Sequence, residues 1–496
     1  MKRRWWLPAA AGFALLLSTQ SVLAATGFTT QVSPAAQTNA TEPSVAIDHS
    51  DGTVWVAWQA GNGRNVARSD DGGRTFVQTP VGGLNDIGDV DIRIGGPTPC
   101  ATPVSPSTTN AGCIPGKHRV YVTSIEEIPL PLQAHLSYSD DRGASWTTND
   151  LAAVNPSFID RPWLAVDPST VSANQDLVYI AYHDFTISQI WVAISSDGGQ
   201  AFVQTDVTAQ NAVAFTDSFC NTIPSSIEVD RETHEVYVEW ITSDFVSNTT
   251  TGCDISQIQN FHKVYVAHSL AGGALWDAHL VFDGGASTNT DKVFATLAVD
   301  DSGTPGTSGN VYSVFSDNLI PSVPNEYDIW FTHSGDKAST WSQPTQVNNG
   351  GGTNYFPWIA AGSTGRVDFI YLHTADLLPS DATLSPWYTK FAQTTDGTDA
   401  VPKFGVTSAS SSIMHVGAIC TNGIFCTVEG EPFGNRDLAD AISIAIDRGG
   451  SAGLVWTDQG KMLHGPTHIT YGCVTAQMTA IAGANHGLSC KGPAGP

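Results

Sequence analysis

The sequence predicts an all-β protein, a single β-propeller of about seven four-stranded blades closed by its N-terminal strand. Three observations predict it: a turn octapeptide that recurs along the chain, a pair of strands before each copy, and no long helical periodicity. A chain of 496 residues exceeds the usual size of one core, so several domains or one repeat architecture are expected. The repeats favour the second, with six blades as the alternative count.

The octapeptide is typical of a tight hairpin turn. It reads SDDGGRTF at 69–76, SDDRGASW at 139–146 and SSDGGQAF at 195–202, and weaker copies lie at 268–276 and 333–341. An Asp carboxylate can accept bonds from the N–H groups of such a turn, and glycine supplies positive φ. The final Trp or Phe would fill space between neighbouring sheets. We therefore expect these aspartates to be structural rather than catalytic.

Two strands precede each turn, the first usually ending in Asp. The first such pair is 44–48 with 54–58. Equivalent pairs follow at 89–94 with 120–124, 163–167 with 178–182, 226–230 with 236–240, 296–300 with 311–315, 357–361 with 367–372, and 443–447 with 453–456. The spacing of roughly 60 residues is long for a four-stranded blade and leaves room for generous loops.

The last unit lacks a convincing fourth strand after the strand near 468–471. Residues 28–32 (FTTQV) resemble the fourth strands at 76–79 and 202–205. We expect this N-terminal strand to complete the last blade and so remove an open sheet edge. The competing candidate is 474–482.

Residues 1–24 are predicted to be a signal peptide. Three basic residues follow Met1, an apolar stretch spans 9–17, and small residues end it at 22–24. This stretch is too short for a membrane span, and no later segment approaches about 18 apolar residues. We expect a secreted protein, extracellular or periplasmic, that does not enter a membrane. The remaining chain divides into the propeller, 25–473, and a C-terminal tail, 474–496.

The chain is strongly acidic, with a formal net charge of −25 that becomes −28 when Lys2, Arg3 and Arg4 are removed. Such a surface repels phosphate backbones, so a nucleic-acid partner is not expected. An acidic substrate would need a local basic pocket. A glycan is the expected partner, and a monomer the expected state.

The 8 cysteines fall as neighbours in sequence. An even number in an exported chain favours disulfides, although the sequence leaves many pairings open. No CxxC spacing indicates zinc. The local pairing hypothesis is Cys100/Cys113, Cys220/Cys253, Cys420/Cys426 and Cys473/Cys490, the last of which would tether the tail.

The turns of the octapeptide join third to fourth strands, so they lie on one face of the disk. Residues before each inner strand and after each second strand then gather on the other face, over the channel where propeller pockets form. Nearly every blade supplies a polar group there. Before inner strands stand Glu42, Asp89, Arg93, Asp160, Arg161, Trp163, Tyr355 and Arg436, and after second strands stand Glu126, Glu127, His183, Asp184, His373 and Asp458.

Arg93, Arg161 and Arg436 occupy equivalent positions in this scheme. Guanidinium groups that converge on a channel could clamp a substrate carboxylate bidentately. The alternative is that each arginine pairs with a neighbouring Asp. The segment from Asp160 to Trp163 is the most pocket-like, its alternative being the start of a strand fixed by Pro162 with Trp163 buried.

His183, Asp184 and His373 follow second strands, where a histidine can be a general base, a metal ligand or a hydrogen-bonded loop residue. Rim aspartates could hold calcium, but no calcium-loop spacing is present. We expect no cofactor, with Ca²⁺ as the option left open.

The octapeptides resemble the Asp box, or BNR repeat, of the sialidase-like propellers, over nearly the whole mature chain. Enzymes of that superfamily use an arginine triad for the sialic acid carboxylate, a Tyr/Glu nucleophile pair and an Asp acid/base. This chain departs from them in having seven units rather than six. The resemblance implies Arg93, Arg161 and Arg436 as the triad, Glu126 or Glu127 with Tyr355 as the nucleophile pair, and Asp160 as the acid/base. Trp163 and Asp458 are added as binding residues because of their place on the rim.

Three functions follow. The first is a glycoside hydrolase acting on acidic glycans, similar to an exo-sialidase. The second is a polysaccharide lyase in which His183 or His373 abstracts a proton beside a uronate carboxylate held by Arg161. The third is a propeller that only binds a glycan or protein. Arg, Tyr and Glu clustered in the channel would favour the first, His and Tyr beside Arg the second, and a rim of mutually paired charges the third.

Overall fold

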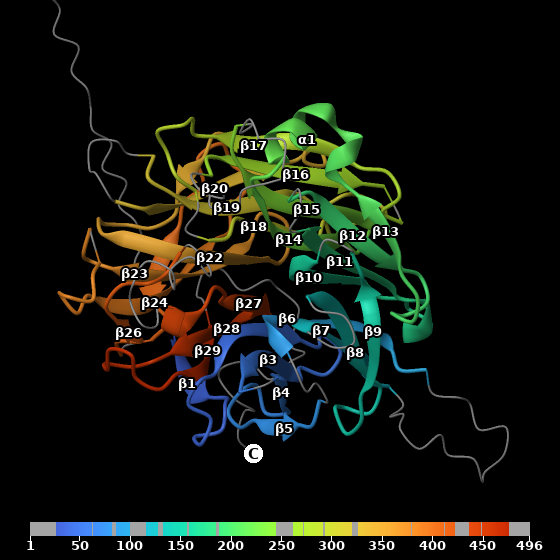
Figure 1. The fold of residues 1–496 in the computed structure, drawn as a ribbon, viewed down its shortest axis with the longest axis horizontal. Helices are drawn as coiled ribbons and strands as arrows, with labels where there is room; N and C mark the ends of the chain where they lie inside the picture. Colours follow the sequence, from blue (N-terminus) through green and yellow to red (C-terminus); the bar gives the residue numbers. More distant parts are fainter. Residues whose placement is uncertain are drawn as a thin grey trace, which may run out of the picture.

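The computed structural model describes residues 26–61, 63–81, 86–99, 116–126, 132–155, 158–184, 188–244, 261–270, 272–290, 293–319, 326–377, 379–410, 412–421, 436–447 and 449–475. They form seven antiparallel sheets that follow one another around a ring (Figure 1). The predicted all-β propeller with seven blades is confirmed, and the alternative of six is excluded.

In blades 1 to 6 the strands run from inner to outer in chain order, whereas the outer strand of blade 7 is the N-terminal strand of the chain. Blade 1 holds β2 (Thr41–Ile47), β3 (Val54–Ala60), β4 (Gly63–Ser69) and β5 (Val77–Thr79); blade 2 holds β6 (Asp86–Pro97), β7 (His118–Glu126), β8 (Gln133–Ser139) and β9 (Thr147–Ala153); blade 3 holds β10 (Ile159–Asp167), β11 (Leu177–Asp184), β12 (Ile190–Ser195) and β13 (Val203–Asp206). Blade 4 holds β14 (Thr222–Asp230), β15 (Glu235–Thr242), β16 (Lys263–Ser269) and β17 (Asp277–Asp283); blade 5 holds β18 (Thr296–Val299), β19 (Val311–Asp317), β20 (Asp328–Ser334) and β21 (Thr345–Gln346).

Blade 6 holds β22 (Thr353–Ala361), β23 (Val367–Thr374), β24 (Pro386–Thr394) and β25 (Gly405–Ser408), and β26 (His415–Val416) also pairs with β24. Blade 7 holds β27 (Ser443–Ile446), β28 (Ser451–Asp458), β29 (His468–Thr475) and β1 (Thr26–Gln31). Short helical turns interrupt the strands at η1 (Ala173–Gln175), η2 (Thr208–Gln210), α1 (Ala212–Ser218) and η5 (Arg436–Leu438). In the described part of the chain, none of the helices has the length and apolar character needed to span a bilayer.

The N-terminal strand closes the ring, as predicted. β1 pairs antiparallel with β29, with Phe28 opposite Cys473 and Gln31 opposite Thr470. The competing candidate at 474–482 is wrong at its start, because β29 itself continues to Thr475. In Figure 1 the blue N-terminal strand β1 lies beside the red strand β29.

The Asp turns have the predicted hydrogen bonds. Asp71 accepts from the backbone N–H of Arg74 at 3.0 Å and of Thr75 at 2.9 Å, and the hydroxyl of Ser69 accepts from Gly73 N at 2.7 Å. Backbone groups of the corresponding turns donate in the same way to Asp141, Asp197 and Asp336, the last in a degenerate copy. The interpretation of these aspartates as structural is confirmed by this geometry.

Aromatic side chains join neighbouring blades at the level of these turns. Tyr121 and Tyr179 occupy the same position on the second strands of blades 2 and 3 and lie against turn glycines of the next blade. Blade 7 has Gly453 at that position, and Tyr471 of β29 occupies the space instead. A Cβ on Gly73 would lie 2.0 Å from Tyr471 Cε1, so the closing contact requires glycine there.

The described cysteines are Cys220, Cys420 and Cys473, all of them buried and none of them free. Cys100, Cys113, Cys253, Cys426 and Cys490 lie outside the described residues, as do the leader and most of the tail. The predicted pairing therefore stays a prediction.

Candidate functional site

A β-bulge near the start of several inner strands aims side chains at one mouth of the channel. The strand register slips at Thr41/Ser44, Gly88/Asp91, Asp160/Trp163 and Tyr355/Trp358. Glu42, Asp89, Arg161 and Phe356, which lie inside these slips, have φ values of 53°, 56°, 58° and 55°. Positive φ costs energy in residues with a Cβ, and such strain is concentrated at functional sites. The bulges therefore mark equivalent, specially oriented positions in blades 1, 2, 3 and 6.

Arg161 is the centre of a charge cluster at this mouth. Its Nη1 lies 2.8 Å from Asp89 Oδ1 and 3.8 Å from Glu42 Oε1, and its Nη2 lies 2.5 Å from Asp440 Oδ2. Arg436 of η5 also contacts Asp440, at 2.7 Å. Carboxyl groups from blades 1, 2 and 7 are thus joined through one guanidinium of blade 3. Both arginines are paired with carboxylates rather than left as a substrate clamp, but their partners are Asp89 and Asp440 and not the Asp beside each arginine in the sequence.

Asp160 is the carboxylate of the cluster that solvent reaches most easily. Its side chain is 30% exposed, against 10% for Asp89, 5% for Glu42 and 0% for Asp440. Behind it, His183 Nε2 lies 3.4 Å from Asp160 Oδ2, while His183 Nδ1 lies 2.9 Å from the carbonyl oxygen of Thr222. His183 therefore positions Asp160 from a buried location on β11.

The surroundings push the pKa values of these carboxyl groups in opposite directions. Burial raises the pKa of Asp89 well above its usual value, against the lowering charge of Arg161. Burial and the charge of Asp440 raise the pKa of Glu42. For Asp160, burial is outweighed by the hydrogen bond from His183 and the charge of Arg161, which lower the pKa. Burial of Asp440 is likewise outweighed, by the charges of Arg161 and Arg436, so its pKa is lowered.

Asp89 and Asp160 also interact with each other. Their carboxyl groups lie within hydrogen-bonding reach, an arrangement that raises the pKa of Asp89 and lowers that of Asp160. Two carboxyl groups so close cannot both ionise easily. The opposite pKa shifts therefore favour the proton on Asp89 and the negative charge on Asp160.

Aromatic rings fill the channel beneath the cluster. The ring of Trp163 lies edge-to-face on those of Phe294 and Trp358, each at 5.2 Å between centroids. The Arg161 guanidinium lies 5.1 Å above the Phe294 ring. Trp163 is 4% exposed and its indole N–H donates to the carbonyl oxygen of Pro224 at 2.9 Å. Trp163 is therefore a buried channel residue, as its alternative interpretation held.

Of the predicted site residues, Asp160, Arg161, His183 and Arg436 come together. Arg93 does not: it lies further along β6, 2.5 Å from Asp91 and 3.6 Å from Glu228. The expectation that three arginines occupy equivalent positions is wrong, because Asp89 rather than Arg93 is at the bulge position that matches Arg161.

The predicted nucleophile pair is not assembled. Glu126 is buried 2.5 Å from Arg64 and 2.7 Å from His135, where blades 1 and 2 meet. Tyr355 belongs to blade 6, where its ring packs on those of Tyr327 and Trp387. Glu127 lies outside the described residues.

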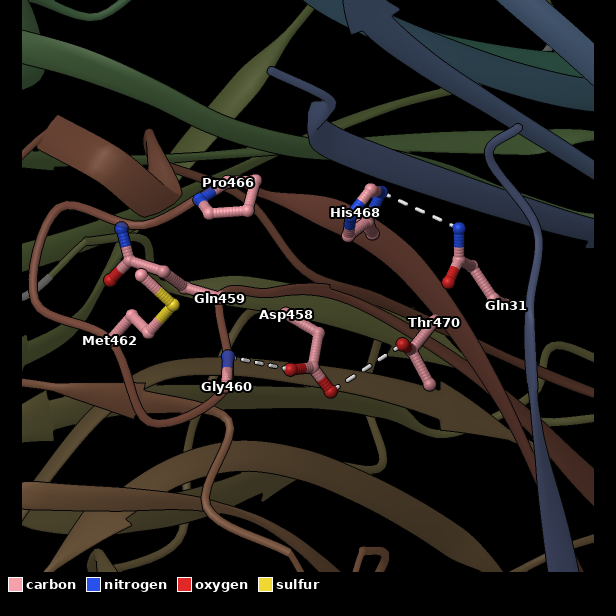
Figure 2. A pocket seen from close by; sticks show the side chains of 8 residues that line it. All are labelled: Gln31, Asp458, Gln459, Gly460, Met462, Pro466, His468 and Thr470. Carbon is pink, nitrogen blue, oxygen red and sulfur yellow. Dashed lines mark hydrogen bonds between the residues drawn. The ribbon is translucent and has the colours of Figure 1, made fainter. Parts of the chain in front are cut away.

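Two further predicted residues face away from the cluster. The Asp184 carboxylate accepts the indole N–H of Trp191 at 3.0 Å on the outer side of blade 3. Asp458 lines a pocket of about 290 Å³ between β28, β29 and β1 (Figure 2). Its carboxylate there accepts from Gly460 N at 2.9 Å and from the Thr470 hydroxyl at 3.4 Å.

His373 lies on β23 of blade 6, apart from Arg161. Its Nδ1 is 2.9 Å from Asn354 Oδ1. Burial and the charge of Lys390 lower the pKa of His373 to about 4, so its ring is neutral at neutral pH.

Sequence reasoning placed Glu42 and Asp89 on the rim but gave them no role, and it missed Asp440. The sequence did contain a signal for Glu42, because Glu42-Pro43 and Arg161-Pro162 are the same kind of dipeptide at the start of an inner strand. No side-chain group with the composition of a metal site occurs among the described residues.

No family model matches the chain, and no curated protein does. Solved structures resemble it over most of its length. An α-L-arabinofuranosidase from Fusarium graminearum is 13% identical, with 92% of this chain and 99% of that chain covered and a TM-score of 0.43.

An intramolecular trans-sialidase from Ruminococcus gnavus is 11% identical, with coverages of 88% and 94% and a TM-score of 0.41. An ulvan lyase is 10% identical, with coverages of 89% and 95% and a TM-score of 0.48. At these values the similarities carry no activity over to this chain.

Proposed function

We propose that this chain is a secreted, monomeric, carbohydrate-active propeller that hydrolyses a glycosidic bond at the channel mouth. The observation that supports this proposal is the separation of pKa values among the carboxyl groups around Arg161. Acid/base hydrolysis needs one carboxyl group that holds a proton and one that has lost it. Asp89 supplies the first and Asp160 the second.

Asp160 is the group that meets the substrate, since it is the most exposed carboxylate of the cluster. Two glycosidase carboxyl groups that flank a sugar are at least roughly 5 Å apart, so Asp89 and Asp160 are too close to stand on opposite sides of it. They act on one side as a proton-sharing pair, which gives its shared proton to the leaving oxygen and then recovers a proton from the water that adds to the anomeric carbon. Arg161 and His183 are positioning residues.

The sugar at the mouth is proposed to be uncharged. A sialic acid carboxylate needs guanidinium groups without another anion, and Arg161 and Arg436 are both held by Asp440. The same pairing counts against Arg161 as the neutralising group of a lyase. It also favours one other candidate, a propeller that binds a glycan at this mouth without cleaving it.

The test is an assay of the purified protein on aryl glycosides of neutral sugars, including arabinofuranosides, with an aryl sialoside and a uronate polysaccharide beside them. We expect release from a neutral substrate and a fall in kcat of about 10²-fold or more in Asp160→Asn. The control is Asp277→Asn, at a 72% exposed side chain of β17 in blade 4.

Turnover of the sialoside alone would refute the neutral sugar, and wild-type rates in Asp160→Asn would refute the acid/base pair. The binding candidate replaces the hydrolase if no substrate is hydrolysed but a glycan binds, and if Asp160→Asn abolishes that binding while the control Asp277→Asn does not.

A further inference from the structure

Three polar side chains share one half-exposed face of blade 6. In the register of β23 and β24, His373 is opposite Tyr388, and Tyr371 is opposite Lys390. Residues opposite each other on antiparallel strands point to the same side, and diagonal neighbours lie within reach of long side chains. His373, Tyr388 and Lys390 are all partly exposed, whereas Trp387, Thr389 and Phe391 on the other side of β24 are buried.

This face of blade 6 is turned toward blade 5. The Asn354 side chain, which contacts His373, donates to the carbonyl oxygen of Tyr327 in the segment before β20 at 2.8 Å. Tyr371, on the same side of β23, packs in one cluster with Ile329 and Phe331 of blade 5. The three polar groups therefore lie on the face of blade 6 that is turned toward blade 5.

Among the residues that the structure describes, no carboxylate forms an ion pair with Lys390. Among the described lysines that are at least half-buried, Lys117, Lys263 and Lys337 each contact an Asp or Glu within 2.8 Å. The amino group of Lys390 has a hydroxyl instead, that of Ser408 at 3.1 Å. Burial, with no anion to oppose it, lowers the pKa of Lys390. In a chain of net charge −25, an amino group kept apart from every described carboxylate can take an external anion.

The tautomer of His373 is fixed by its neighbour. Because the amide nitrogen of Asn354 donates to Tyr327, its Oδ1 must accept, and the proton of the neutral His373 ring is on Nδ1. The Nε2 atom is left as a hydrogen-bond acceptor. This atom suits a hydroxyl group and repels an anion, whereas the Lys390 amino group suits an anion. The two side chains could therefore bind different parts of one ligand.

We propose that His373, Tyr388 and Lys390 bind a uronic acid residue of a glycan, with its carboxylate on Lys390 and a ring hydroxyl donating to His373 Nε2. The Tyr388 ring offers an apolar face for the sugar ring. This inference rests on the proposed function only in taking a glycan as the ligand. It assigns the glycan both an uncharged sugar, at the channel mouth, and an acidic one, on blade 6.

The experiment measures binding of methyl glucuronide, methyl glucoside and sodium sulfate to the full chain by calorimetry at neutral pH. We expect the glucuronide to bind, the glucoside to bind at least about tenfold more weakly, and Lys390→Gln to lose about tenfold in affinity for the glucuronide. Lys390→Arg should retain binding. Lys403→Gln is the control, at an exposed lysine of the same blade, and thermal unfolding verifies that each variant is folded.

Equal affinity for glucuronide and glucoside would overturn the inference, as would unchanged binding in Lys390→Gln. Sulfate binding as strong as that of the glucuronide would also overturn it, because the hydroxyl contact to His373 would then contribute nothing. Labelled His373 gives a second measurement, since a bound carboxylate beside Lys390 should raise the pKa of the ring.

Asp160→Asn separates this inference from the proposed function. We expect it to keep glucuronide binding while it loses hydrolysis. A wild-type protein that binds glucuronide and hydrolyses nothing would leave the site on blade 6 standing and refute the hydrolase.

Discussion

Glu239→Gln should make the protein more stable at alkaline pH. Glu239 lies on β15, fully buried, and its carboxyl group accepts from the hydroxyls of Ser226 and Ser313. Burial raises its pKa from 4.5 to about 8, with only these hydroxyls to lower it. The folded protein therefore holds a proton that the unfolded chain releases above about pH 4.5.

The sign follows from the proton count. Between about pH 4.5 and pH 8 the unfolded chain binds fewer protons at this site than the folded one, so the free energy of unfolding falls as pH rises. Each tenfold change in proton affinity corresponds to about 1.36 kcal/mol. Moving the pKa from 4.5 to about 8 thus lowers the free energy of unfolding by at most about 5 kcal/mol above pH 8. Glutamine has no proton to lose and keeps an oxygen and a nitrogen for the two hydroxyls.

The assay is urea unfolding at closely spaced values from pH 5 to pH 9, followed by tryptophan fluorescence, for wild type, Glu239→Gln and Asp277→Asn. The difference between Glu239→Gln and wild type should grow with pH in favour of the variant, by several kcal/mol across the range. Asp277→Asn should run parallel to wild type. A constant difference between Glu239→Gln and wild type at every pH would refute the reasoning.

Two other predictions follow from contacts between blades. Gly73→Ala should lower the free energy of unfolding by several kcal/mol, because the new Cβ would overlap Tyr471 at a φ of +92°. Gly61→Ala, with a φ of +66° and no atom within 4 Å, should lose only about 1 kcal/mol in the same urea titration, and equal losses would contradict the steric argument. His118 lies 2.9 Å from Asp48, which raises the His118 pKa, so the stabilisation is complete below about pH 6.5 and disappears as pH rises through the folded-state pKa. His118→Gln should therefore cost about 1 kcal/mol at pH 6 and less at pH 9, and a loss independent of pH would contradict this assignment.

The fold was predictable because its information is local and repeated. A turn such as 69–76 specifies its own hydrogen bonds, and several such turns with strands before them indicate one blade each. Closure by β1 was predictable for a related reason: the last unit was one strand short, and an unpaired edge is costly.

The sequence predicted part of the site: Asp160 and Arg161 lie at the start of an inner strand, and His183 lies at the end of a second strand. Arg161 was recognised. Arg93 was wrongly counted as its equivalent, because a bulge shifts the strand register but cannot be detected from the spacing of residues in the sequence. Asp440 follows the short helix η5 rather than a strand, so no strand pattern pointed to it. Glu126 was misassigned because its partner, Arg64, comes from another blade, and no local pattern reveals such a partner.

The pairing of β1 with β29 joins residues that are far apart along the chain. The side chains of Gln31 and His468 are in contact, although 437 positions separate these residues. Bringing such distant ends together costs an entropy that scales with the logarithm of the intervening length, about 5 kcal/mol here. Assembly of blade 7 should therefore be a late and slow event in folding. Until it occurs, β29 offers an open edge to any copy of β1, including that of a second molecule. Refolding at high concentration should consequently yield strand-swapped dimers that dilution before refolding avoids.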